Sequence, residues 1–205
     1  LEGANGKGVD HSEAQRSAVK AGTPRTPRSE DLQRIVRQHQ DWATSGGRSG
    51  ARAELVERDL GGVDFSGLDL SGGDLHGSRL AGACFRDSIL VMSNLAGADL
   101  RRADFRNATL EGANFASANL AGANLAGARL GAVEIKKPDG SGAGRFWAAN
   151  LSGANLAGAN LTGVDLRGAN LSKADLSGAQ TTGADLSGAQ LEDARLDAAG
   201  PSRAS

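Results

Sequence analysis

The chain has 205 residues and a formal net charge of −1, with 30 Gly, five Phe, two Trp and no Tyr. This composition excludes a core built mainly on aromatic side chains, and the near-neutral charge argues against direct binding to nucleic acid. The single cysteine, Cys84, excludes an intramolecular disulfide framework. Without a long apolar run or a visible secretory signal, the chain is expected to be cytoplasmic and to make no membrane contact.

The N-terminal part of the sequence divides into a tail and a helix. Residues 1–28 mix Gly, Lys, Ser, Thr and Pro without periodicity, which predicts a flexible tail or linker. Residues 29–47 predict a helix, because Ser29 is a good N-cap, acidic residues follow it, and two glycines end the pattern. The apolar face of this helix consists of Leu32, Ile35, Val36, His39 and Trp42.

A repeat of five residues fills most of the remaining sequence. Counting in fives from Leu55 to Ile135, and again from Phe146 to Leu196, gives 28 positions, and all but Thr181 are Leu, Phe or Ile. A period of five suits neither a helix nor a flat strand. It is consistent with a chain that turns a corner in every pentad, so that each central residue points to one common axis. Asp, Asn and Gly, which surround the centres, favour such corners.

Tandem pentads such as Ala98-Asp99-Leu100 and Ala154-Asn155-Leu156 resemble the pentapeptide repeat family. The resemblance implies an all-β solenoid over residues 48–197, a right-handed quadrilateral β-helix of about seven coils with four pentads each. The equal spacing of Phe65, Phe85 and Phe105 by 20 positions agrees with four pentads per coil. The segment 39–47 is similar to a lead-in of some bacterial members of this family.

The two ends of such a solenoid are expected to differ. The first coil exposes apolar side chains and unpaired strand edges, so the helix at 29–47 is expected to cap it through the five residues of its apolar face. Residues 198–205 form a short C-terminal tail, and no second cap is evident there. We therefore expect a partly open last coil and an end-to-end homodimer through it.

The repeat is interrupted between Ile135 and Phe146. Residues 136–145 contain Pro, Asp, Gly and Ser, which predicts an external loop outside the solenoid wall. Two interpretations remain open, namely a tolerated insertion and a loop that contacts a partner, because insertions in solenoids often gather on a binding face.

Four residues break the rule that outward positions are small or polar. Ile89, Val91 and Met92 surround the centre Leu90, and Trp147 lies beside the loop. An exposed apolar group can be an isolated spot, can contact an unassigned tail, or can belong to a protein-binding patch. We take these four residues as the candidate protein-binding site.

The sequence offers no catalytic constellation. The three histidines are far apart, no His or Cys pair has metal-ligand spacing, and the acidic residues of the first coil are expected to point to different faces. We therefore predict a protein that is not an enzyme, with no cofactor, metal or small-molecule substrate, acting as a structural or protein-interaction scaffold for a protein partner.

The alternative function is a DNA mimic that modulates a type II topoisomerase (gyrase), as in the quinolone-resistance members of the family that the pentads resemble. Residues 51–135 and 146–197 carry 11 Lys or Arg and 17 Asp or Glu, so the rod is only mildly acidic.

Overall fold

A computed structural model describes residues 30–136 and 140–196 of the chain. The tail expected at 1–28, the helix start at Ser29 and the tail expected at 198–205 lie outside these residues.

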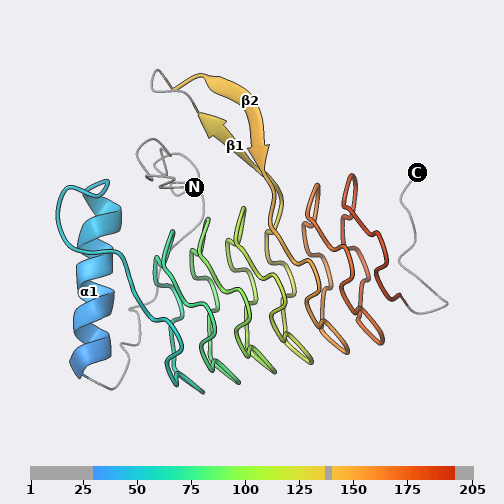
Figure 1. Cartoon of the computed structure of the whole chain (residues 1–205), viewed down its shortest axis with the longest axis horizontal. Helices are drawn as coiled ribbons and strands as arrows, with labels where there is room; N and C mark the ends of the chain where they lie inside the picture. The colour runs from blue at the N-terminus through green and yellow to red at the C-terminus, as the bar shows by residue number, and fades with distance from the viewer. Residues whose placement is uncertain (1–29, 137–139, 197–205) are drawn as a thin grey trace.

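The repeat folds into a right-handed quadrilateral β-helix whose coils stack along one axis (Figure 1). Parallel bridges join residues 20 positions apart, as in Asp59 with Arg79 and Asp99 with Asn119. Four pentads therefore make one coil, as the spacing of the phenylalanines predicted. The sixteen centres from Leu55 to Leu130 and the ten from Leu151 to Leu196 correspond to about seven coils.

Each pentad makes one rung and one corner. The Leu100 amide donates to the Asn119 carbonyl of the next coil at 2.8 Å, while the Asp99 amide donates to the Ser78 carbonyl of the previous coil at 2.9 Å. The corner closes by a bond from the Ala98 amide to the Leu95 carbonyl at 3.1 Å. Gly97 occupies this corner with φ 64°, a left-handed angle that glycine adopts without strain.

The interior is a continuous column of Leu, Phe and Ala side chains. Three phenyl rings stack through the first three coils, with centroids 5.1 Å apart for Phe65 and Phe85 and 4.7 Å apart for Phe85 and Phe105. Phe115 meets Phe105 edge-on at 5.9 Å. Burial of this column is the main favourable term in the stability of the fold.

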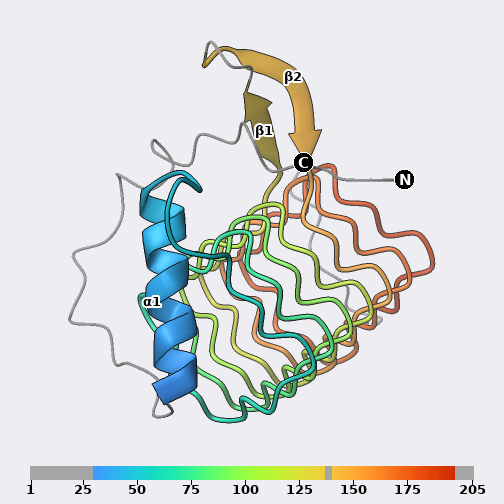
Figure 2. The same ribbon diagram turned by 60° about the vertical axis from the view of Figure 1, so that its left-hand side comes forward.

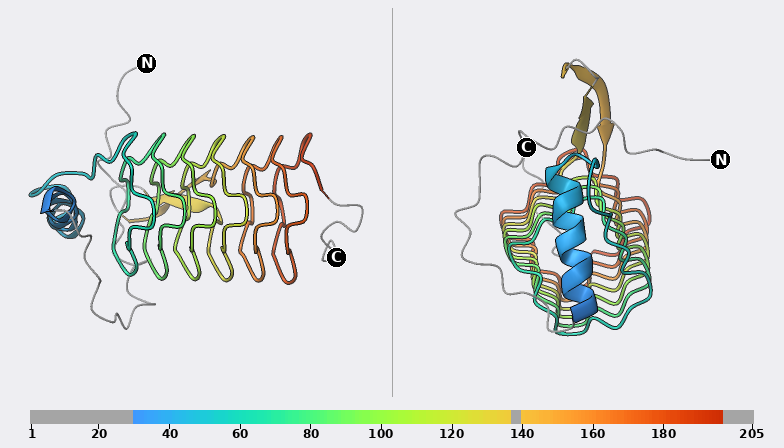
Figure 3. Two further views of the ribbon diagram at one scale, coloured as in Figure 1. Left: turned by 90° about the horizontal axis from the view of Figure 1, so that it is seen from below. Right: turned by 90° about the vertical axis from the view of Figure 1, so that its left-hand side faces the viewer.

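Helix α1 (Glu30–Thr44) lies across the end of the first coil (Figures 2 and 3). Leu32, Val36 and His39 are buried against that coil, Ile35 packs at the edge of the core, and Trp42 is half-buried. Beyond the helix, Gly46 and Gly47 take positive φ angles of 63° and 81°, and the Gly47 amide donates to the Trp42 carbonyl at 2.8 Å. The chain then enters the first rung at Ala53.

The other end of the described solenoid has more exposed centres. Leu176 is 3% exposed, Leu186 and Leu191 are only partly buried, and Leu196 is 40% exposed. The last bridge pairs Asp175 with Arg195. An end-to-end homodimer through this coil remains a prediction.

The break in the repeat is an antiparallel hairpin of strands β1 (Val133–Lys136) and β2 (Gly142–Trp147). Asn114 pairs with Asn150, 36 rather than 20 positions away, so sixteen residues are inserted at one corner. The expected loop at 136–145 was therefore too short. Ile135 and Phe146 are also not interior centres: Ile135 lies in β1, and Phe146 is 66% exposed in β2.

Replacing a central leucine is expected to cost stability in proportion to its burial. Leu100→Ala, in the interior of the rod, should lower the free energy of unfolding by about 2–5 kcal/mol. Leu191→Ala, at the same pentad position but only partly buried in the last coil, should cost clearly less. Urea unfolding followed by circular dichroism measures both. Equal losses would mean that the last coil is covered in solution.

Candidate functional site

The hairpin of β1 and β2 projects from one corner of the solenoid and leans toward the end that carries α1 (Figure 1). It leaves the wall after Leu130, whose amide still donates to the Asp165 carbonyl at 2.7 Å, and the chain returns to the wall at Asn150. The wall therefore resumes the same hydrogen-bond pattern on both sides of the insertion.

The base of the hairpin packs on the corner of the preceding coil at Gly112. A methyl group placed there would lie 3.2 Å from Val133 Cγ1, 3.3 Å from Met92 Cγ and 3.4 Å from Trp147 Cδ1. Met92 comes from the coil before Gly112, Val133 from β1 and Trp147 from β2. Gly112 is therefore the contact point that lets the hairpin rest on the wall.

Met92 has a strained, left-handed backbone conformation at this corner. Its φ is 56°, and the equivalent corners before and after it are glycines with φ 68° and 67°, at Gly72 and Gly112. A bulky residue in the left-handed region costs roughly 1–2 kcal/mol relative to its usual conformation. An unbranched thioether side chain at this corner fills the irregular space beside the hairpin base.

The structure brings together two of the four candidate binding residues, Met92 and Trp147. The expectation that Val91 faces solvent is wrong, because this side chain is only 5% exposed. Val91 directly precedes Met92, at the corner whose equivalent residues in the neighbouring coils are Gly72 and Gly112. A methyl group placed on Gly72 would lie 3.5 Å from the Trp42 ring, and one placed on Gly112 would contact the hairpin base. Val91 is therefore buried at a corner whose neighbouring coils carry Trp42 on one side and the hairpin base on the other.

Ile89 is the fourth candidate residue and lies on the adjoining face. There it is half-buried and bridges to Asp69 and Thr109 of the neighbouring coils. Whether any of the four residues binds a protein remains a prediction.

Phe146 is the exposed group that the sequence reasoning placed inside. Trp147 pairs with Val133 and faces the solenoid, whereas Phe146 pairs with Glu134 and points to the other side of the hairpin, since successive strand residues alternate. The two residues before Phe146 are Gly144 and Arg145 instead of the usual Ala and Asp or Asn. The residues before the buried centre Leu80 also depart from the usual pattern, since it follows Ser78 and Arg79, so this departure alone does not identify an exposed residue.

Below the hairpin, Glu111 makes a partly buried ion pair. Its Oε1 accepts from Arg129 Nε at 2.8 Å, while its Oε2 is buried and has no hydrogen-bond partner among the residues that the structure describes. Glu111 directly precedes Gly112, so this pair supports the wall on which the hairpin base rests.

Elsewhere on the walls, arginines neutralise the acidic residues two positions earlier. Bidentate pairs join Asp99 to Arg101, Asp104 to Arg106 and Asp165 to Arg167. Hydrogen bonds from Arg101 hold the pKa of Asp99 below its ordinary value, and Arg167 does the same for the pKa of Asp165. The arginines are exposed, so each pair adds little to stability.

Within residues 30–136 and 140–196, no three His, Cys, Asp or Glu side chains gather as a metal site would require. In the same part of the chain, no helix has the length and apolar character needed to cross a membrane. That the chain is not an enzyme and is cytoplasmic remains a prediction.

A solenoid of four-pentad coils with Leu or Phe centres and Asp or Asn beside them defines a class of repeat protein. The family model for pentapeptide repeats matches eight copies in this chain, over residues 51–90, 93–131 and 149–188. Because these matches cover more than half of the chain, the protein belongs to the pentapeptide repeat family. The second matched segment ends at residue 131 and the third begins at residue 149, so the match is interrupted at the hairpin.

Solved structures of the same fold include proteins of different origin. QnrB1, a plasmid-mediated fluoroquinolone resistance protein, is 26% identical over 69% of this chain and 74% of its own, with a TM-score of 0.41. Rfr23 from the cyanobacterium Cyanothece 51142 is 26% identical over 68% and 85%, with a TM-score of 0.35.

A pentapeptide repeat protein from the Arabidopsis thaliana thylakoid lumen is 29% identical over 71% of this chain and 72% of its own, with a TM-score of 0.25. No curated protein sequence matches the chain. With such low TM-scores, these similarities carry no argument about function.

A side chain at Gly112 is expected to lift the hairpin from the wall. Gly112→Leu should speed hydrogen exchange of the β1 and β2 amides several-fold, because the new side chain collides with Val133, Met92 and Trp147. Gly97→Leu is the matched control, since Gly97 has nearly the same φ but open space around it. Both variants carry the same backbone strain, so equal exchange in the two would show that the contact does not hold the hairpin.

Proposed function

We propose that this protein is a non-enzymatic interaction scaffold, and that the hairpin of β1 and β2 is the part that binds a protein partner. The observation that carries the proposal is the exposure of two adjacent aromatic side chains on the hairpin, Phe146 at 66% and Trp147 at 48%.

The exposed aromatics stand out against the rest of the surface. Within the described residues, the only other large apolar side chain with comparable exposure is Leu196 in the last coil. Aromatic residues are enriched at protein interfaces and contribute a large share of the binding free energy there. Arg145, exposed beside Phe146, adds a second residue type that is enriched at such surfaces.

The solenoid gains no evident stability from the hairpin. A ladder of amide side chains continues past the insertion: Asn94 Oδ1 accepts from Asn114 Nδ2 at 3.1 Å, and Asn114 Oδ1 accepts from Asn150 Nδ2 at 3.2 Å. The backbone rungs continue as well. The wall's hydrogen bonds continue past the hairpin while its base packs at Gly112, and this combination supports a binding role over a merely tolerated insertion.

Removal of the hairpin is expected to abolish partner binding and leave the rod folded. Deleting residues 132–147 together with Ala148→Gly joins Leu130 to Leu151 through Gly-Gly-Ala-Asn, which restores the five-residue spacing. Thermal unfolding should then change little, and affinity capture should lose the partners that the intact chain retains.

Phe146→Ser is the matched point variant for this experiment, because it removes one exposed ring and keeps the hairpin. It should weaken capture of the same partners without changing the melting temperature. Identical partners for all three proteins would rule out the hairpin as the binding element. A rod that fails to fold after the deletion would show that the hairpin is structural.

The topoisomerase alternative remains a prediction, and the charge arrangement does not favour it. Duplex DNA carries an unpaired negative charge about every 1.7 Å along its axis. On this rod many carboxylates are already paired with arginines, as in Asp59 with Arg79 and Asp104 with Arg106. We therefore expect no inhibition of gyrase supercoiling and no protection from quinolones. Inhibition that persists at physiological salt would contradict this.

A further inference from the structure

His39 is the polar residue at the centre of the contact between α1 and the first coil. Its side chain is fully buried, and its ring stacks on Trp42 with centroids 5.4 Å apart. Its Nδ1 accepts a hydrogen bond at 2.9 Å from the backbone amide of Ala53, the residue that begins the first rung. The Ala53 carbonyl in turn accepts from the Asp74 amide at 2.8 Å, so this bond ties the helix directly to the β-helix wall.

This arrangement fixes the protonation state of the ring. An imidazole nitrogen that accepts a hydrogen bond carries no proton, so His39 is neutral with its proton on Nε2. Nε2 is buried and has no hydrogen-bond partner among the described residues. A second proton on Nδ1 would point at the Ala53 N–H, which places two donors face to face and leaves a buried charge without an acceptor.

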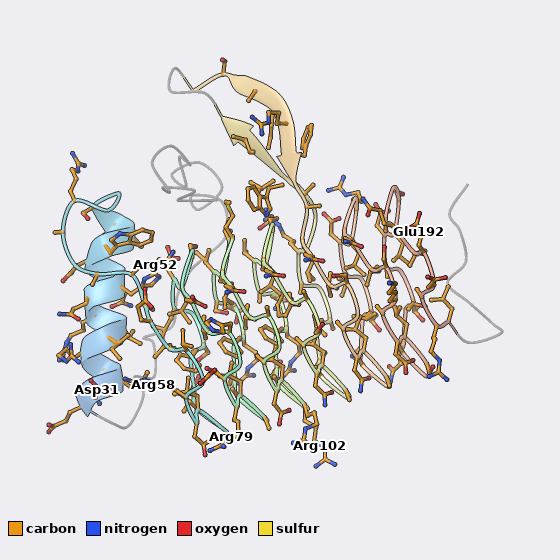
Figure 4. All side chains as sticks on the ribbon, in the orientation of Figure 1. Asp31, Arg52, Arg58, Arg79, Arg102 and Glu192 are labelled. Atoms are coloured by element: carbon orange, nitrogen blue, oxygen red, sulfur yellow. The ribbon has the colours of Figure 1, made fainter. Side chains whose placement is uncertain are left out.

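The charged groups around the ring do not reverse this preference. Burial lowers the pKa of His39 below its ordinary value, and it outweighs the carboxylate of Asp69, which favours protonation. Arg52, on the segment between α1 and the first rung, opposes protonation. Figure 4 shows Arg52 near the C-terminal half of α1, far along the helix from Asp31 and Arg58.

We propose that His39 makes the docking of α1 a pH-sensitive latch, closed at neutral pH and released as the solution becomes moderately acidic. In the released helix the ring is exposed and titrates near its ordinary pKa of about 6.5. Because the docked state needs neutral His39, its stability is complete above that pH and is lost as the pH falls below it. Each pH unit shifts the ratio of docked to released helix by up to tenfold.

The ionic contacts of α1 respond at lower pH and can be separated from this effect. Asp31 bridges to Arg58 of the first coil and to Arg34 of the helix, both at 2.6 Å. These arginines hold the pKa of Asp31 below its ordinary value of 3.8, with Arg58 the larger cause. Stability from this carboxylate is present above pH 3.8 and is lost only below it. A change between pH 6.5 and 4.5 therefore does not come from Asp31.

Release of the latch would uncover the N-terminal end of the solenoid. The buried side chains of Leu32 and Val36 belong to the same apolar cluster as the first coil, so both surfaces would become accessible together. An uncovered coil end is a template for pairing with another strand. Acidification would thus expose apolar side chains and an unpaired strand edge at this end of the solenoid, where another chain could pair.

Hydrogen exchange of a peptide spanning residues 30–44 tests the latch, with a peptide from coils three and four as the internal reference. In the full chain, protection of α1 should fall up to tenfold between pH 6.5 and 5.5 after correction for intrinsic exchange, while the reference peptide stays unchanged. His39→Asn places a non-titrating acceptor where Nδ1 lies, so its α1 protection should not change over this range.

His76→Asn is the matched control, because His76 is half-buried on the wall, away from α1, and its replacement should leave the transition in place. If α1 of the His39→Asn variant does not dock at pH 7.5, a second measurement replaces it. The pKa of the His39 ring is then measured by NMR in the unaltered chain and compared with the release of α1. A pKa below 6.5 with acid release of α1 supports the latch. An ordinary pKa, or constant α1 protection down to pH 4.5, overturns it.

Discussion

The hydrogen bonding between successive coils is the constraint on which the rest of this molecule depends. Rung amides and carbonyls, such as those of Leu100 and Asp99, find their partners on the coils above and below. A strand group without a neighbouring coil would be left unpaired. The walls are therefore fixed by self-complementarity, and variation is confined to the corners and the two ends. The hairpin occupies a corner, and α1 occupies an end.

A corner tolerates a large insertion because only its two flanking rungs must keep their register. Leu130 and Asn150 keep theirs, although the insertion places sixteen extra residues between them. The base of the insertion packs on the wall, because Gly112 has no side chain to keep it away and Met92 contacts it. If the hairpin binds a partner as proposed, its anchored base would limit the conformational entropy lost on binding.

The period of five was sufficient to predict the solenoid, because the fold repeats one local solution at every pentad. The same periodicity misled at Ile135 and Phe146, where large apolar residues continued the count by coincidence although the preceding Ala and Asp or Asn were missing. Burial of Val91 was beyond prediction for a different reason. Its corner lies between Gly72, near Trp42, and Gly112, near the hairpin base, and only the stacking of coils brings these sequence-distant groups to one edge of the rod.

Residues that break the repeat rule are informative only when the reason for the break is visible in three dimensions. Met92 stands where glycine is the unstrained choice, and its side chain explains the exception by filling the base of the hairpin. His39 stands where an apolar residue could pack against the coil without burying a polar nitrogen. Its Nδ1 accepts a hydrogen bond from Ala53, but its buried Nε2 has no partner among the described residues. An apolar side chain would leave the Ala53 amide without this acceptor and would not titrate near pH 6.5, so under the proposed latch His39 adds both a hydrogen bond and a dependence on protonation.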